Sequence, residues 1–190
     1  IAYIAHQNHF LGFSYNRLWA SRNGHALADF NGDGKIDVLP YHGGEDANQG
    51  VILPYSNDRS NQLLSVVDGV GRETKFSYKP LTAGTSIYQK GTGAVFPLID
   101  ITAPINVVSS MSQPNGVGGN SITSFMYKGA KVHLQGKGFL GFTEVTSSNT
   151  TTGIVATQQY EFNTTFYQAM LLKSVVTTSN TKLNEITYTN

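Results

Sequence analysis

The chain has 190 residues, in which 13 Lys and Arg nearly balance 12 Asp and Glu, and it contains no cysteine. This length suffices for one large domain or two small ones, the lack of thiols excludes disulfides and thiolate-bound metals, and the near-zero net charge disfavours nucleic-acid binding. No apolar run reaches the roughly 18–20 residues of a membrane helix, so we expect no direct membrane insertion. The sequence opens on Ile1 without an initiator methionine, and we expect it to be part of a longer protein.

The first distinctive segment is "DFNGDGKID", which carries oxygen-bearing side chains at alternate positions. Counted from Asp29 as position 1, Asn31 is position 3, Asp33 is position 5, the Lys35 carbonyl is position 7 and Asp37 is position 9. A calcium loop uses this spacing to surround a hard cation that takes about six to eight oxygen ligands. The sequence therefore predicts that these five residues bind one Ca²⁺.

The flanks of this loop decide which kind of calcium site it is. Gly34 permits the sharp turn, but an EF-hand would also need a glutamate where this chain has Pro40, and the flanks show no helical period. We therefore expect a loop between two short strands, with residues 26–28 leading in and residues 36–39 leading out. The alternative is a plain turn rich in Asn, Asp and Gly that binds no metal.

The rest of the chain has the pattern of β-structure. "TKFSYK" places Phe76 and Tyr78 on one face of a strand and Lys75, Ser77 and Lys79 on the other. "VATQQYEF" and "EITYT" repeat this alternation, and turn signals lie at residues 68–71, 114–119 and 150–153. We expect antiparallel hairpins with almost no helix, and a boundary that separates residues 1–60 from residues 61–190.

Catalytic motifs are missing from the sequence. "HQNH" would direct its two imidazoles to opposite faces of a strand, and neither a zinc-protease motif nor a serine-hydrolase elbow is present. "KGFLGF" partly matches an RNA-recognition signature, but Leu140 interrupts it, and Phe139 and Phe142 are better interpreted as packing aromatics. We therefore expect a protein without catalytic activity; a hydrolase ranks last among the function classes.

Two known families share these motifs. "HALADFNGDGKIDVL" resembles the FG-GAP or VCBS repeat, the calcium-binding blade of integrin-like β-propellers. The runs "LLSVVDGVGRETKFSYKPLT", "YQKGTGAVFPLIDITAPINVVSS" and "YKGAKVHLQGKGFLGFTEVTSSNTTTGIVATQQYEF" resemble the region that follows the propeller in toxin-complex B subunits and SpvB-like RHS (YD-repeat) proteins.

The resemblance implies an all-β fold in which residues 1–60 end a propeller region and residues 61–190 begin an RHS-type β-shell. It implies a non-catalytic part of a secreted or cell-surface bacterial protein that encapsulates and delivers a toxic polypeptide. The implied partners are the remainder of a larger RHS or toxin-complex chain and its A and C subunits. The alternative is an extracellular calcium-dependent adhesion or glycan-binding module.

Overall fold

The chain divides into two compact units, Ile1–Ser60 and Asn61–Asn190. The computed structural model describes residues 62–163, 165–179 and 181–189, and five short strands before them. In the first unit, β1 (His9–Phe10) pairs with β2 (Phe13–Ser14), and β4 (Asp37–Pro40) lies between β3 (His25–Ala28) and β5 (Leu53–Pro54). All of these pairs are antiparallel.

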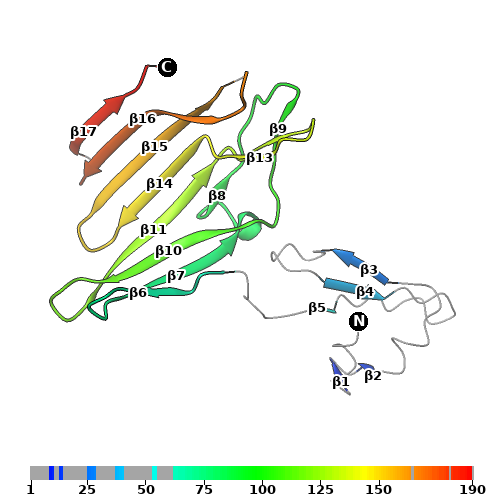
Figure 1. Ribbon diagram of the computed structural model, residues 1–190, viewed down its shortest axis with the longest axis horizontal. Coiled ribbons are helices and arrows are strands. Elements are labelled where there is room, and N and C mark those ends of the chain that lie inside the picture. Colours follow the sequence, from blue (N-terminus) through cyan, green and yellow to red (C-terminus); the bar gives the residue numbers. More distant parts are fainter. Residues whose placement is uncertain are drawn as a thin grey trace. The chain divides into compact units, whose positions relative to one another are not determined.

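The second unit is built on one nine-stranded sheet, which Figure 1 shows with β17 at one edge and β6 at the other. Its order is β17-β16-β15-β14-β11-β10-β7-β6, and β8 pairs in parallel with the end of β11. The strands are β6 (Ser65–Val67), β7 (Glu73–Pro80), β8 (Tyr88–Gln89), β10 (Asn106–Pro114), β11 (Asn120–Lys128), β14 (Glu144–Asn149), β15 (Ile154–Phe162), β16 (Ala169–Thr178) and β17 (Thr181–Thr187).

These strands confirm the prediction of an all-β, mainly antiparallel fold. Within the described ranges the one helical element is a short 3₁₀ turn, η2 (Leu81–Ala83). The alternation predicted for "TKFSYK" is confirmed as well, because β7 runs without interruption through this segment and pairs with β10.

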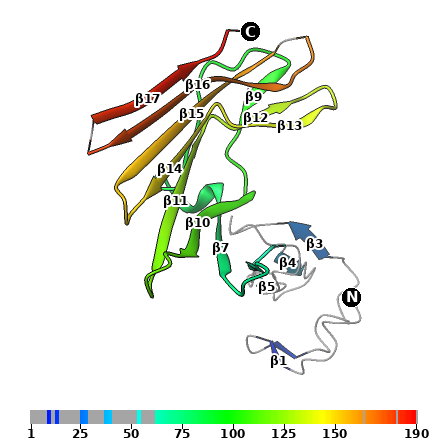
Figure 2. The same cartoon turned by 60° about the vertical axis from the view of Figure 1, so that its left-hand side comes forward.

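The succession of hairpins is interrupted between β11 and β14, which sequence periodicity did not predict. There the chain forms β12 (Lys131–His133) and β13 (Gly138–Gly141), which join β9 (Leu98–Asp100) in a separate three-stranded sheet (Figure 2). Gly129 and Gly141 lie at the two ends of this excursion with φ angles of 66° and 119°. Only glycine adopts such angles readily, and a Cβ atom at Gly129 would also overlap the Thr143 hydroxyl.

The main hydrophobic core lies where the small sheet meets the large one. Leu81, Ile87, Tyr88 and Ala130 are buried there, and partly buried apolar side chains that include Phe142 pack around them. The Phe142 ring lies 4.7 Å from that of Tyr127 and 6.3 Å from that of Tyr88, between centroids. Phe142 is therefore a packing residue, as expected from its motif, whereas Phe139 is 44% exposed and contacts Phe142 edge-on.

Each of four turns is closed by an Asp or Asn side chain at its start. Oδ1 of Asp68 accepts hydrogen bonds from two backbone N–H groups of the β6–β7 turn, and Asn115, Asn149 and Asn163 do the same in their turns. Such bonds satisfy backbone donors where the chain reverses. The first three turns are those predicted at residues 68–71, 114–119 and 150–153.

Candidate functional site

The predicted calcium loop connects two paired strands. Ala28, the last residue of β3, lies opposite Asp37, the first residue of β4, so the two ends of the connection are adjacent. This agrees with the expectation of a loop between short strands and suits a set of oxygen ligands that must converge on one ion. Asp29, Asn31, Asp33 and Lys35 lie outside the described residues, and of Asp37 only the backbone is described. Calcium binding therefore stays a prediction.

In the part of the chain that the structure describes, no group of three His, Asp or Glu side chains is arranged to hold a metal ion. None of the helical structure in the same residues is long and apolar enough to cross a membrane. The features that stand out in the second unit are a sheet with two chemically different faces and a buried polar cluster.

One face of the large sheet is rich in hydroxyl and charged side chains, and Met126, Val155 and Val175 lie among them. Strand register places Ser77 beside Ser110, Ser110 beside Ser124, and Ser124 beside Ser148, a row of serines across four neighbouring strands. The next row includes Thr146 and Thr157, whose hydroxyl oxygens lie 3.4 Å apart. We call this surface the hydroxyl face.

Two contacts between neighbouring strands on the hydroxyl face involve charged groups. Gln159 of β15 donates to the Glu144 carboxylate of β14 at 3.0 Å, and Lys173 of β16 lies 2.7 Å from Glu185 of β17. Lys182 also binds Glu185. Hydrogen bonds from the two lysines, with the larger effect from Lys173, lower the pKa of the Glu185 carboxyl to about 2. The outermost strand is thus attached to its neighbour by side chains as well as by its backbone.

The opposite face carries the aromatic side chains. Phe76 lies beside Met111, Phe125 beside Ser147 and Tyr127 beside Val145, and the alternation in β7 and β15 adds Tyr78 and Tyr160 to the same side. These five aromatic side chains, which define the aromatic face, are half-buried. Such a face suits contact with another surface, because half-buried rings retain apolar area that water solvates poorly.

Tyr127 connects the aromatic face to the strand beside it. Its hydroxyl donates to the Val108 carbonyl of β10 at 2.8 Å, and burial raises the pKa of Tyr127 to about 12. This bond lies close to the bulge between Val108 and Ser110, where β10 changes register against β7. The hydroxyl therefore fixes β10 at the place where its ladder is irregular.

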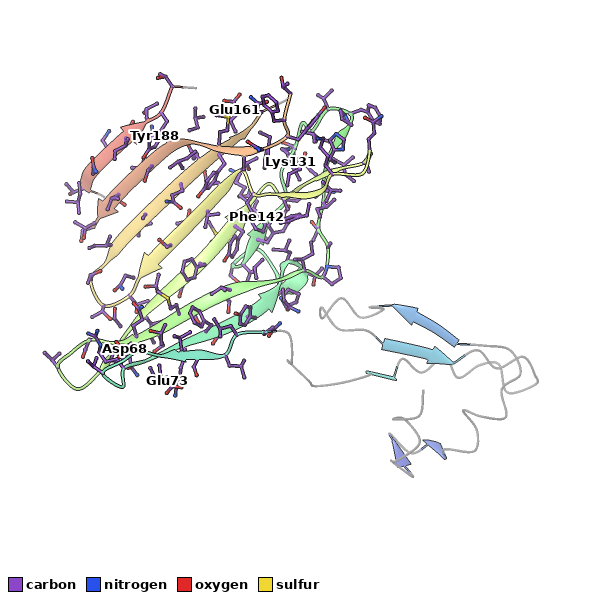
Figure 3. The ribbon with its side chains drawn as sticks, viewed as in Figure 1. Asp68, Glu73, Lys131, Phe142, Glu161 and Tyr188 are labelled. Atoms are coloured by element: carbon purple, nitrogen blue, oxygen red, sulfur yellow. The ribbon has the colours of Figure 1, made fainter. Side chains whose placement is uncertain are left out.

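The buried polar cluster joins the small sheet to the core. Lys131 of β12 and Asp100 of β9 face each other in register, with Nζ 2.6 Å from Oδ1, and their side chains are only 14% and 8% exposed. The second carboxylate oxygen accepts from the Ala94 backbone N–H at 3.0 Å. A buried ion pair of this kind is stable only when such additional hydrogen bonds are made. Figure 3 marks Lys131 near Phe142.

Tyr88 completes the polar cluster. Its hydroxyl donates to the Ile101 carbonyl at 2.6 Å and accepts from the Ala130 N–H at 3.0 Å, which bridges the segments that follow β9 and precede β12. Burial raises the pKa of this hydroxyl, and the nearby Asp100 carboxylate contributes to the increase. The polar cluster (Tyr88, Asp100 and Lys131) cross-links three chain segments around Gly91, where a side chain would collide with Asp100 Oδ1.

Sequence reasoning did not identify the polar cluster, because its members lie far apart in the chain. The only local signal is an acid and a lysine in short strands that are otherwise apolar, "LID" and "KVH". His133 of the second strand is buried, and its ring lies 4.3 Å from that of Tyr167 in the β15–β16 turn. It is thus a packing histidine.

Comparison with known protein families identifies the family to which the chain belongs. Residues 9–174 match the family model described as the middle/N-terminal region of the insecticide toxin TcdB. The chain belongs to this family. The match begins in the first unit and extends through most of β16, and it supports the toxin-complex part of the resemblance. No curated protein and no solved structure matches the chain.

Proposed function

We propose that this chain is a non-catalytic structural segment of a secreted bacterial toxin-complex or RHS-type protein, in which its large sheet forms part of a wall around a toxic polypeptide. The observation that carries the proposal is the family match across residues 9–174. The two-faced sheet supports it, because a wall must pack on one side and meet water on the other. The aromatic face is the packed side and the hydroxyl face is the wet side.

The partners in this proposal are the remainder of a larger toxin-complex chain and its A and C subunits. The first unit supplies the end of an FG-GAP-like propeller, and one Ca²⁺ bound by Asp29, Asn31, Asp33, Lys35 and Asp37 stiffens it. The ion has a structural role here, since it would neutralise three clustered carboxylates and order the loop that carries them.

The polar cluster supports a structural role rather than a catalytic one. The Lys131 amine is bound to Asp100, and the Tyr88 hydroxyl already donates one hydrogen bond and accepts another. These groups are engaged in holding the small sheet to the core, which favours a rigid wall.

Protection of the enclosed polypeptide tests the proposal. In the assembled toxin complex, Lys131→Met should weaken the wall and make the enclosed polypeptide more sensitive to an added protease, whereas Lys75→Met, at an exposed ion pair, should not. Assembly is checked by size-exclusion chromatography of both variants. Calcium-dependent binding of the unmodified chain to glycans, with protease protection the same in all variants, would instead support an adhesion module.

A further inference from the structure

The tip of the β10–β11 hairpin holds an asparagine followed by a glycine, Asn115 and Gly116, in an exposed turn. The side-chain oxygen Oδ1 of Asn115 accepts two backbone hydrogen bonds, from Val117 N–H at 3.0 Å and from Gly119 N–H at 2.9 Å. Gly116 has a φ angle of +80°, and apart from its two chain neighbours no atom lies within 4 Å of the position where a side chain would begin. No side chain at position 116 therefore shields the backbone nitrogen that lies beside the Asn115 amide.

We infer that Asn115 deamidates spontaneously in the folded protein, through attack of the Gly116 backbone nitrogen on the Asn115 side-chain amide. As the N–Cγ bond forms, negative charge develops on Oδ1, which the Val117 and Gly119 N–H groups already contact. Donors placed at such an oxygen stabilise the charge that appears in the transition state.

The reaction needs only water as a co-reactant. The Cγ–Nδ2 bond breaks, and ammonia leaves with the proton that the Gly116 nitrogen gives up, so that a cyclic imide remains. Water then opens the ring at either of its two carbonyl groups, which yields aspartate or isoaspartate. One water is consumed, one ammonia is released, and nothing is oxidised or reduced.

Two other asparagines in this unit provide an internal comparison. Oδ1 of Asn149 accepts from two backbone N–H groups at 3.0 and 2.9 Å, and Oδ1 of Asn163 does so at 2.8 and 2.9 Å. The residue that follows each of them in the sequence is a threonine, and a branched side chain such as that of Thr150 crowds the attacking nitrogen. Oδ1 bonding is thus shared by all three, whereas the following glycine sets Asn115 apart. At Asn149 the N–H of the following residue is also bound, to the Ile122 carbonyl at 3.0 Å.

The environments of the amides differ in the same direction. Nδ2 of Asn149 donates to Ser121 Oγ at 2.9 Å and to Thr123 Oγ1 at 3.2 Å, which holds the group that would have to leave. Asn115 is exposed to the water that opens the imide, whereas Asn149 and Asn163 are only partly exposed. Conversion of Asn115 would place a new carboxylate at the hairpin tip, and isoaspartate would also add a carbon to the backbone of the turn.

Peptide mapping by mass spectrometry tests this inference on the folded chain, incubated at mildly alkaline pH. The peptide that contains Asn115 should become heavier by the mass difference between OH and NH₂. Its rate of conversion should be at least about tenfold higher than the rates of the peptides that contain Asn149 and Asn163. A tenfold ratio of rates corresponds to a difference of about 1.4 kcal/mol in activation free energy. Peptides with the Asn-Gly pairs at 23–24 and 31–32 are mapped separately. A smaller ratio would overturn the inference.

Substitution at Thr150 supplies the reciprocal test. Thr150→Gly should make Asn149 deamidate several-fold faster than in the unmodified chain, whereas Thr150→Ala, which keeps a Cβ atom, should leave its rate low. Circular dichroism verifies that both variants remain folded. If Thr150→Gly leaves Asn149 as slow as Thr150→Ala does, the following glycine does not control the reaction and the mechanism is wrong.

Discussion

At the scale of single residues, the ion pair between Asp100 and Lys131 distinguishes this fold most clearly from a simple run of hairpins. Both partners are largely withdrawn from water, so neither can lose the other without leaving an unpaired buried charge. The same carboxylate also holds the loop at Ala94. The pair therefore contributes chiefly by fixing one arrangement of β9 and β12.

Replacing one partner of this pair should be costly. We expect Lys131→Met to lower the free energy of unfolding of the second unit by about 3 kcal/mol, the typical cost of an uncompensated buried charge. The exposed pair of Lys75 and Glu73 provides the control, because Lys75→Met should change stability by no more than about 0.5 kcal/mol. Urea unfolding followed by far-ultraviolet circular dichroism measures both. Equal effects of the two substitutions would contradict the assignment.

Tyr127 should make stability fall at alkaline pH. Its folded-state pKa of about 12 lies above the ordinary value of 10, so its contribution is complete below pH 10 and is lost as the pH rises towards 12. Tyr127→Phe should reduce this pH dependence by the part due to Tyr127 and cost about 1 kcal/mol at neutral pH, because the Val108 carbonyl loses its hydrogen bond. Unfolding curves measured between neutrality and about pH 11 test this. The control is Tyr160→Phe, which removes an exposed hydroxyl.

Sequence reasoning at this scale succeeded where the signal was local. Phe142 was expected to pack and does, and Phe76 and Tyr78 share a face because neighbours in a strand alternate. The partnership of Asp100 with Lys131 could not be predicted, since it depends on how β9 meets β12 across 31 positions of sequence. Periodicity carries no information on such long-range pairing.

At the scale of elements, β17 is held to β16 by a side-chain ion pair as well as by its backbone ladder. All of its residues are exposed, and it lies at the edge of the sheet. Glu185 binds Lys173 across the β16–β17 ladder and Lys182 within its own strand. Acid that protonates this carboxyl would remove both contacts together.

We therefore expect β17 to loosen in acid before the rest of the sheet. The Glu185 pKa is lowered from 4.5 to about 2, so its stabilising effect is present above pH 4.5 and disappears as the pH falls towards 2. The protection factors of the β17 amides, which correct the observed hydrogen exchange for its intrinsic pH dependence, should decrease over this interval. Glu185→Gln should remove this decrease. Glu161→Gln on β15 is the matched control. An unchanged acid response in Glu185→Gln would contradict this role.

The elements also show where sequence patterns stop being informative. Three turns were predicted from their Gly, Asn and Asp residues, and each is closed by an Asx side chain. The excursion through β12 and β13 was not predicted, because "KVH" and "GFLG" are too short to show a period. The parallel pairing of β8 with β11 was missed for the same reason.

At the scale of the whole molecule, the calcium prediction concerns the first unit. Calcium at about 100 times its dissociation constant should raise the free energy of unfolding by about 2.7 kcal/mol if it binds only the folded state. Asp33→Ala should abolish this gain, whereas Asp46→Ala, outside the motif, should retain it. Calorimetric melting with calcium and with chelator measures the difference. An unmodified chain that melts identically in both would show that the loop is a plain turn.

The central claim is that the large sheet is a wall whose aromatic face is covered and whose hydroxyl face is open in the assembled toxin. The chain has no cysteine, so a single introduced thiol reports on one face at a time. Gln158 and Glu161 are both exposed on β15, and strand alternation places Gln158 on the aromatic face and Glu161 on the hydroxyl face.

Maleimide labelling of Gln158→Cys and Glu161→Cys tests this claim most directly. In the chain alone, a small and a polymer-linked maleimide should both label each variant. In the assembled toxin, the polymer-linked reagent should label Glu161→Cys and leave Gln158→Cys largely unmodified. Equal labelling of the two positions by the polymer-linked reagent in the assembled toxin would contradict the two-faced wall.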